Sequence, residues 1–215
     1  MTKVSCPLIS LVVTVLVLSL PVSAAYSPSA VSLFTTGNQL LNAGNYTDAI
    51  ESFDNAIALE PGYYEAWDAK ADALNRNRQY SDALAASDHS LSLNPAYGKG
   101  WINRGFILYN LGRYDDEIKA YDKAIAIDPD NADAWFNKGY ALAGAGDYDG
   151  AIQAFDTVAG INPGYPNLAA NRKIAVMNRD SAMPYYIRYA AWIVLAGLVI
   201  ACAGIWTYTR KTKRR

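Results

Sequence analysis

The stretch AWFNKGYALAGAGDYDGAIQAFD (residues 134–156) has the apolar spacing of a helix and yet contains four glycines. Gly139 lies in the middle of this pattern, between Trp135 and Leu142, where a glycine costs about 1 kcal/mol relative to alanine. The same position recurs every 34 residues along the chain, as Gly37, Ala71, Gly105 and Gly139. A small residue that returns at a fixed period in a helical pattern indicates a close contact between helices.

Other residue types follow the same period. The recurring positions are Trp67, Trp101 and Trp135; Leu40, Leu74, Leu108 and Leu142; Tyr46, Tyr80, Tyr114 and Tyr148; and Pro61, Pro95, Pro129 and Pro163. Apolar residues spaced three and four apart form two blocks of about 14 residues per period, which predicts two amphipathic helices joined by a short polar turn. Because such a pair cannot bury its apolar face alone, consecutive pairs must stack into a solenoid.

These motifs resemble the tetratricopeptide repeat family, whose unit is a helix-turn-helix of about 34 residues. The resemblance covers residues 30–165 and implies an all-α fold, a right-handed superhelical solenoid of four repeats. Their predicted bounds are 30–63, 64–97, 98–131 and 132–165, with a capping helix at 166–180. The mid-helix glycines then allow the partner helix to approach, with Ala49, Ala83 and Ala151 as the facing small residues. Closer packing of large residues around the contact, with Phe53, Tyr121 and Phe155 as the second-helix aromatics, offsets the cost of the glycine.

Two units depart from the repeat. The second carries Ser87 and Ser90 where an aromatic residue is expected, which predicts looser packing there. The third carries Glu117 in a column that is alanine in the other units. A carboxylate at a helix contact must be paired, protonated or turned outward, and Arg104 is the candidate partner. We therefore expect Glu117 to be a locally compensated defect and not a catalytic acid.

Both ends of the chain have sequences typical of membrane segments. Residues 1–24 combine Lys3, a short apolar run and small residues before a cleavage point, which predicts a signal peptide; an uncleaved anchor is the alternative. Residues 189–208 carry no charge over 20 positions, which predicts one C-terminal transmembrane helix; a buried core helix is the alternative. The basic residues of 209–215 then form a cytoplasmic tail, which places the repeats on the outer face of the cytoplasmic membrane.

A small-residue face within residues 189–208 bears on oligomerisation. Gly197, Ala201 and Gly204 lie on one side of a helix, and such a face allows two spanning helices to approach closely. A homo-oligomer formed through it is therefore one expectation. The alternative is that spanning helices are commonly rich in glycine and alanine.

The chain lacks the motifs of an enzyme. Cys6 and Cys202 lie in the two terminal apolar segments, and His89 is the single histidine, expected on a solvated face. The sequence contains no phosphate loop, metal-ligand spacing or nucleophile–base set, so we expect no enzymatic activity, metal or cofactor. The near balance of 19 basic and 20 acidic residues disfavours nucleic acid as a partner. Asn45, in Asn45-Tyr46-Thr47, is a possible N-glycosylation acceptor.

The family resemblance implies a protein–protein interaction module, an adaptor or scaffold that binds a peptide or helix of a partner protein in a concave groove lined by the first helices. The expected groove residues are Glu65, Asp68 and Asp72 at an acidic end, and Phe106, Tyr109, Phe136 and Tyr140 at an aromatic end. Such a groove favours a protein or peptide ligand with basic and apolar residues. Asp68 and Asp72 are expected to attract the basic residues, and the tyrosines to anchor the apolar ones.

The resemblance also disfavours one class of ligand. Phe34, Ala69 and Asn103 stand where the family's clamp for a C-terminal carboxylate has Lys, Asn and Arg, although Asn38 and Lys99 match it. A ligand with an acidic terminus is therefore not expected. The alternative function is a structural or assembly role through self-association or envelope attachment, with the groove incidental. A weaker third is that the C-terminal segment is a sorting signal removed by a transpeptidase.

Overall fold

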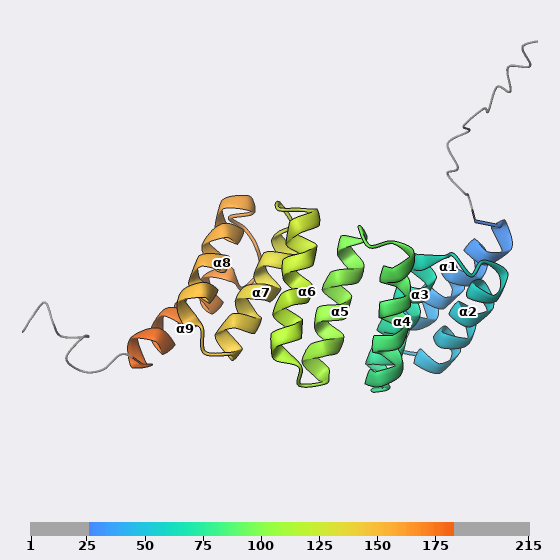
Figure 1. Ribbon diagram of the computed structural model, residues 1–215, viewed down its shortest axis with the longest axis horizontal. Coiled ribbons are helices and arrows are strands. Elements are labelled where there is room, and N and C mark those ends of the chain that lie inside the picture. The colour runs from blue at the N-terminus through green and yellow to red at the C-terminus, as the bar shows by residue number, and fades with distance from the viewer. Residues whose placement is uncertain (1–25, 183–215) are drawn as a thin grey trace, which may run out of the picture.

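The computed structural model describes residues 26–182, and all of the regular secondary structure in that range is helical. The helices stand side by side in chain order and form an elongated solenoid (Figure 1). Their bounds are α1 Pro28–Asn42, α2 Tyr46–Leu59, α3 Tyr64–Arg76, α4 Tyr80–Leu93, α5 Gly98–Asn110, α6 Tyr114–Ile127, α7 Ala132–Gly144, α8 Tyr148–Ile161 and α9 Leu168–Ala182. The segments 1–24, 189–208 with Gly197, Ala201 and Gly204, and 209–215 lie outside the described residues.

The all-helical repeat solenoid is as the sequence predicted, but the membrane part of the predicted fold class needs correction. Within residues 26–182, no helix combines the length and the apolar character required to cross a membrane. These helices have 13 to 15 residues and one polar face, whereas a spanning helix needs about 20 mostly apolar residues. This finding also contradicts the prediction of a single-pass protein whose repeats are displayed on the cytoplasmic membrane.

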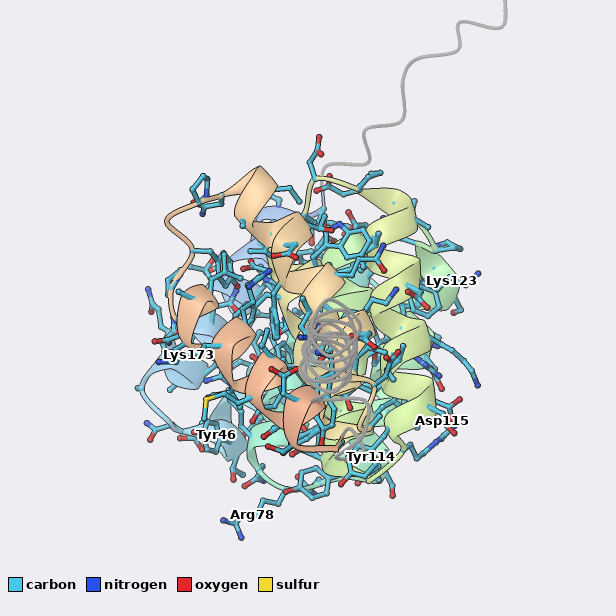
Figure 2. All side chains as sticks on the ribbon, turned by 90° about the vertical axis from the view of Figure 1, so that its left-hand side faces the viewer. Tyr46, Arg78, Tyr114, Asp115, Lys123 and Lys173 are labelled. Atoms are coloured by element: carbon cyan, nitrogen blue, oxygen red, sulfur yellow. The ribbon has the colours of Figure 1, made fainter. Side chains whose placement is uncertain are left out.

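The turns within the helix pairs share one backbone feature. The middle residue of each turn has a left-handed conformation, with φ of 82° at Gly44, 64° at Arg78, 72° at Gly112 and 85° at Gly146. Glycine adopts this conformation freely, whereas Arg78 does so at a steric cost. Figure 2 shows that these turns lie along one edge of the molecule, where Tyr46, Arg78 and Tyr114 are found.

Beside each glycine of the repeated mid-helix position lies an aromatic ring of the second helix in the same unit. A Cβ atom at any of these glycines would lie less than 3.0 Å from a ring carbon. The pairs are Gly37 with Phe53, Gly105 with Tyr121, and Gly139 with Phe155. The nearest contact across each glycine is therefore made by the second-helix aromatic residue that the sequence placed beside it. The alanines Ala49, Ala83 and Ala151 are fully buried in the second helices α2, α4 and α8. Ring burial against the backbone offsets the helical cost of the glycine.

The second unit solves the same packing problem with smaller residues. Ala71 occupies the glycine column and Ser87 the aromatic column, and both are fully buried. Ile107 from the next unit belongs to the same core cluster as Ala71. Ser90 is also buried and donates its hydroxyl to the carbonyl of Tyr64 at 2.8 Å. Ile107 thus contributes apolar contact beside the small residues of the second unit, whereas the Ser87 hydroxyl has no hydrogen-bond partner within residues 26–182. The looser packing expected for this unit stays a prediction.

A ladder of ion pairs joins consecutive units. In each pair a carboxylate of the second helix meets a base of the next first helix, with N–O distances of 2.5 to 2.8 Å. The pairs are Asp54–Lys70, Asp88–Arg104, Asp122–Lys138 and Asp156–Arg172. The first three bases also lie over the tryptophan of their own helix, 5.4 to 5.8 Å from the ring centroid. Arg104 is thus bound to Asp88 and is not the partner of Glu117 that the sequence predicted.

Candidate functional site

Two neighbouring pockets form a groove along α3, α5, α7 and α9, and Tyr109 lines both of them. The first, which we call the Asp72 pocket, has a volume of about 370 Å³. It is lined by Asp72, Asn75, Arg76, Asn103, Phe106, Ile107, Tyr109 and Asn110. The second, the Glu117 pocket, has a volume of about 420 Å³. It is lined by Tyr109, Tyr114, Glu117, Tyr140, Ala141, Ala143, Gly144, Phe155, Asn171, Ile174 and Ala175.

The carboxylates expected at the acidic end are bound to other parts of the chain. Glu65 accepts a hydrogen bond from the Tyr26 hydroxyl at 3.1 Å. Asp72 accepts one from Nε of Arg76, four residues along α3, at 2.9 Å. Of the three predicted acidic groove residues, Asp72 alone contributes to the lining of the two pockets.

Asp68 lies in the interior of the array and not on its surface. Only 2% of the residue is exposed, and Oδ2 accepts a hydrogen bond from Nδ2 of Asn103 at 2.7 Å. Burial raises the pKa of the Asp68 carboxyl to about 6, although the Asn103 amide and the charge of Lys99 oppose that rise. Oδ1 has no hydrogen-bond partner within residues 26–182. The side chain therefore joins α3 to α5, and it has little surface to offer a ligand.

The aromatic end of the groove is open. The exposed fractions of Phe106, Tyr109 and Tyr140 are 43%, 47% and 55%, which is high for large apolar side chains. Phe106 also approaches Tyr121 edge-on, with ring centroids 6.1 Å apart. Tyr109 and Tyr140 come from α5 and α7 and meet at the Glu117 pocket. These three residues give the groove an apolar surface that the core of the solenoid does not cover.

Phe136 has a structural position. Its side chain is half-buried, with its ring centroid 4.8 Å from that of Tyr165 and 5.6 Å from that of Phe155. Phe155 is the ring that covers Gly139. Phe136 thus supports the packing of the fourth unit, and it is absent from the lining of both pockets.

Glu117 is the residue whose role in the site the sequence did not indicate. It lies in the first turn of α6, with 3% of its surface exposed, and lines the larger pocket. Burial raises the pKa of its carboxyl to about 7, and a hydrogen bond with the Tyr121 hydroxyl opposes that rise only in part. Oε2 has no hydrogen-bond partner among residues 26–182. The feature of the sequence that could have indicated this role is the glutamate at a repeat position that is alanine in the other units, three residues after Tyr114.

Two further candidates lie away from the groove. Asn45 is exposed just before α2, and its side chain makes no capping hydrogen bond, so glycosylation there stays a prediction. His89 is exposed, and its ring centroid lies 4.1 Å from that of Trp67. No group of His, Cys, Asp or Glu side chains suited to a metal ion occurs within residues 26–182.

Comparisons with known proteins identify the repeat. A model of the tetratricopeptide repeat family matches residues 34–97, 69–132 and 107–166, which together span more than half of the chain. The crystal structure of MamA is 26% identical, with a TM-score of 0.58 over 62% of this chain and 78% of MamA. No curated protein matches the chain.

Two other solved structures share the fold. YrrB, a TPR protein with an unusual peptide-binding site, is 19% identical, with a TM-score of 0.58 over 71% of this chain and 79% of YrrB. The first TPR of Spaghetti (RPAP3), bound to the HSP90 peptide SRMEEVD, is 21% identical, with a TM-score of 0.52. That match covers 55% of this chain and 94% of the Spaghetti chain.

Proposed function

The chain belongs to the tetratricopeptide repeat family, and on this premise we propose that it is a protein-interaction module that holds a peptide segment of a partner protein in the groove. The observation that carries the proposal is the exposure of Phe106, Tyr109 and Tyr140 beside two pockets that share Tyr109. Exposed aromatic side chains next to concave pockets are typical of the residues that dominate binding energy at protein interfaces. No catalytic step enters this function.

The pockets favour a ligand of mixed character. The exposed aromatic residues provide anchors for apolar side chains, and the Asp72 carboxylate provides a polar contact at the neighbouring pocket. Asp72 already pairs with Arg76, so a basic ligand residue there must compete with an internal partner. We therefore expect the aromatic residues to contribute most of the affinity, and the acidic end to adjust it.

A ligand with an acidic C-terminus is expected to bind poorly. The Spaghetti domain holds the HSP90 peptide SRMEEVD, which ends in acidic residues. In this chain Phe34 and Ala69 stand at two positions of the family's basic clamp, and Asn103 at a third is bound to Asp68. SRMEEVD therefore serves as a negative control peptide for this protein.

Selection from a random dodecapeptide library on the immobilised full-length chain tests the proposal. We expect enriched peptides that combine basic and apolar residues, and no binding of SRMEEVD. The Tyr109→Ala/Tyr140→Ala double variant should lose these peptides. The matched control is Leu59→Ala with Leu93→Ala, which removes two similarly exposed apolar side chains from α2 and α4.

Two results would contradict the proposal. One is enrichment of the same peptides on the tyrosine variant as on the wild-type chain. The other is the absence of any enriched peptide, together with concentration-dependent self-association of the chain in sedimentation experiments. The second result would favour an assembly role instead.

A further inference from the structure

We propose that the Glu117 pocket is a binding site for a single alkylammonium group, supplied by a lysine side chain of the bound segment, with Glu117 as its counter-ion. The inference rests on the proposed function for the source of this ammonium group. The assignment of an ammonium site to this pocket rests on separate observations. These are the buried and incompletely bonded Glu117 carboxylate, the lack of a basic side chain in the described lining, and the aromatic residues around the cavity.

The first observation is the position of the carboxylate. Glu117 is nearly fully buried, lines a cavity of about 420 Å³, and has one carboxylate oxygen, Oε2, with no hydrogen-bond partner among residues 26–182. A buried carboxylate is stable in its charged form only when a cation or several donors compensate for the lost water. Within the described part of the chain, the groups lining the cavity do not supply that compensation.

The second observation is that three bases on the helices around the pocket are engaged elsewhere. Arg104 of α5 is bound to Asp88, and Lys138 of α7 to Asp122. Lys119, half a turn along α6 from Glu117, is bound to Asp116. The lining residues themselves include no basic side chain within residues 26–182. In this proposal, the cation that neutralises Glu117 comes from another molecule.

The third observation is the aromatic character of the cavity. Tyr109 from α5, Tyr114 from α6 and Tyr140 from α7 line it together with Glu117. The faces of phenol rings attract cations, and a carboxylate among such rings adds a charge of the correct sign. The other polar groups near Glu117 are the Tyr121 hydroxyl and the Asn171 amide of α9.

The chemistry favours an ammonium group over a guanidinium group. A lysine ends in a compact charge on a flexible four-carbon stem, whereas a guanidinium gains most from a carboxylate that accepts two parallel hydrogen bonds. Glu117 has one oxygen, Oε2, without a hydrogen-bond partner among residues 26–182. The residues that line the cavity include one glutamate, three tyrosines and one asparagine. The apolar side chains of Ile174 and Phe155 in the lining suit the methylene stem. Because Tyr109 is shared by both pockets, a segment lying in the Asp72 pocket can place a lysine here.

A titration of the full-length chain with n-pentylammonium chloride tests the pocket without a peptide. The readout is the side-chain carboxyl ¹³C resonance of Glu117, followed by NMR as a function of pH. We expect a saturable shift in the wild-type chain, with the pKa of Glu117 falling by about one unit at saturation, equivalent to about tenfold tighter binding by the ionised form. The uncharged analogue 1-pentanol should leave that pKa unchanged.

The matched variant is Glu117→Gln, which preserves the shape of the side chain. We expect it to bind n-pentylammonium about tenfold more weakly and 1-pentanol as well as the wild-type chain does. Equal binding of n-pentylammonium and 1-pentanol would overturn the inference, as would an unchanged affinity in the variant. Tighter binding of n-pentylguanidinium than of n-pentylammonium would overturn the preference for lysine.

Peptides selected from the dodecapeptide library separate this inference from the proposed function. Replacing their lysine by norleucine should weaken binding to the wild-type chain and leave binding to Glu117→Gln unaffected. Suppose that selected peptides require Tyr109 and Tyr140 of the protein and yet bind equally well with lysine or norleucine. Such peptides would refute the lysine site and leave the proposed function intact. Binding of n-pentylammonium at Glu117 without any groove-binding peptide would support the ammonium pocket and refute its peptide source.

Discussion

The two ends of the groove differ in what their polar and aromatic side chains already contact. At the α3 end, Glu65, Asp68 and Asp72 are each bound by another residue of the chain. At the α7 end, Tyr109 and Tyr140 are exposed, and Glu117 has an oxygen without a partner within residues 26–182. The acidic end is richer in charge, yet we propose that the ligand is held mainly at the aromatic end. Asp68 also has an oxygen, Oδ1, without a hydrogen-bond partner in this range, but Asp68 lines neither pocket. The proposal therefore depends on groups that are both unpartnered and part of a pocket lining.

The largest expected effect compares the two ends directly by substitution. Tyr109→Ala with Tyr140→Ala should weaken peptide binding about 100-fold, because truncation of central aromatic residues typically costs about 2 to 4 kcal/mol. Glu65→Gln with Asp72→Asn should weaken it about threefold or less, as expected for polar groups at a rim. Fluorescence titration with a selected peptide measures both. A larger loss at the acidic end would reverse the comparison.

The second prediction compares the two buried carboxylates by their effect on stability. Asp68→Ala should lower the free energy of unfolding by about 2 kcal/mol, because it leaves the Asn103 amide without its acceptor. Glu117→Ala should raise it by about 1 kcal/mol, because it removes a buried and incompletely paired carboxylate. Urea unfolding at pH 8 measures both values. A clear loss of stability in Glu117→Ala would mean that this carboxylate has a necessary internal partner.

The third prediction concerns pH. Burial raises the pKa of Asp68 from its ordinary value of 3.8 to about 6 and that of Glu117 from 4.5 to about 7. The folded chain therefore retains these protons where the unfolded chain has lost them, so both groups favour folding most at low pH. Their contribution should decline as the pH rises from about 4 to about 7. Measured as the free energy of urea unfolding against pH, the decline near pH 7 should be absent in Glu117→Gln. If the variant and the wild-type chain lose stability equally between pH 5 and 7, the raised pKa of Glu117 is contradicted.

The smallest expected effect extends the comparison to the turns. Arg78 has a left-handed backbone in a turn of the second unit, whereas Gly112 occupies the equivalent position in the third. Arg78→Gly should stabilise the chain by about 0.5 to 1 kcal/mol, since relief of the steric cost exceeds the added freedom of the unfolded state. Gly112→Arg should destabilise it by a similar amount. Thermal unfolding measures the change in stability of each variant relative to the wild-type chain. If both variants were stabilised, or both destabilised, the backbone explanation would be refuted.

Much of the fold could be predicted from the 34-residue period. Gly105 and Gly139 indicated a close helix contact, and Pro95 and Pro129 marked the places where second helices end. The aromatic column of the second helices was also predictable, but a repeat pattern does not show how closely each ring approaches its glycine. Tyr121 lies so close to Gly105 that a Cβ atom at this position would be less than 3.0 Å from a ring carbon.

For the candidate site, the sequence indicated which helices carry the exposed aromatic residues, but not which of the predicted side chains reach the groove. The positions of Tyr109 and Tyr140 on first helices indicated exposed aromatic side chains, and both are exposed. The same reasoning placed Asp68 and Phe136 in the groove, although Asp68 is buried against Asn103 and Phe136 packs on Phe155 and Tyr165. Residues one helical turn apart look alike in a register argument, and small rotations of the helix decide which of them reaches solvent.

The sequence by itself determined the helical repeat, because a fixed period of small, apolar and turn-forming residues admits only stacked helix pairs. Tertiary structure alone decided how the charges are distributed. Arg104 pairs with Asp88 on the preceding helix, and Glu117 is left without a basic partner among residues 26–182. The physical reason is distance: the electrostatic environment of a carboxylate depends on groups within a few ångströms of it, and these come from other helices.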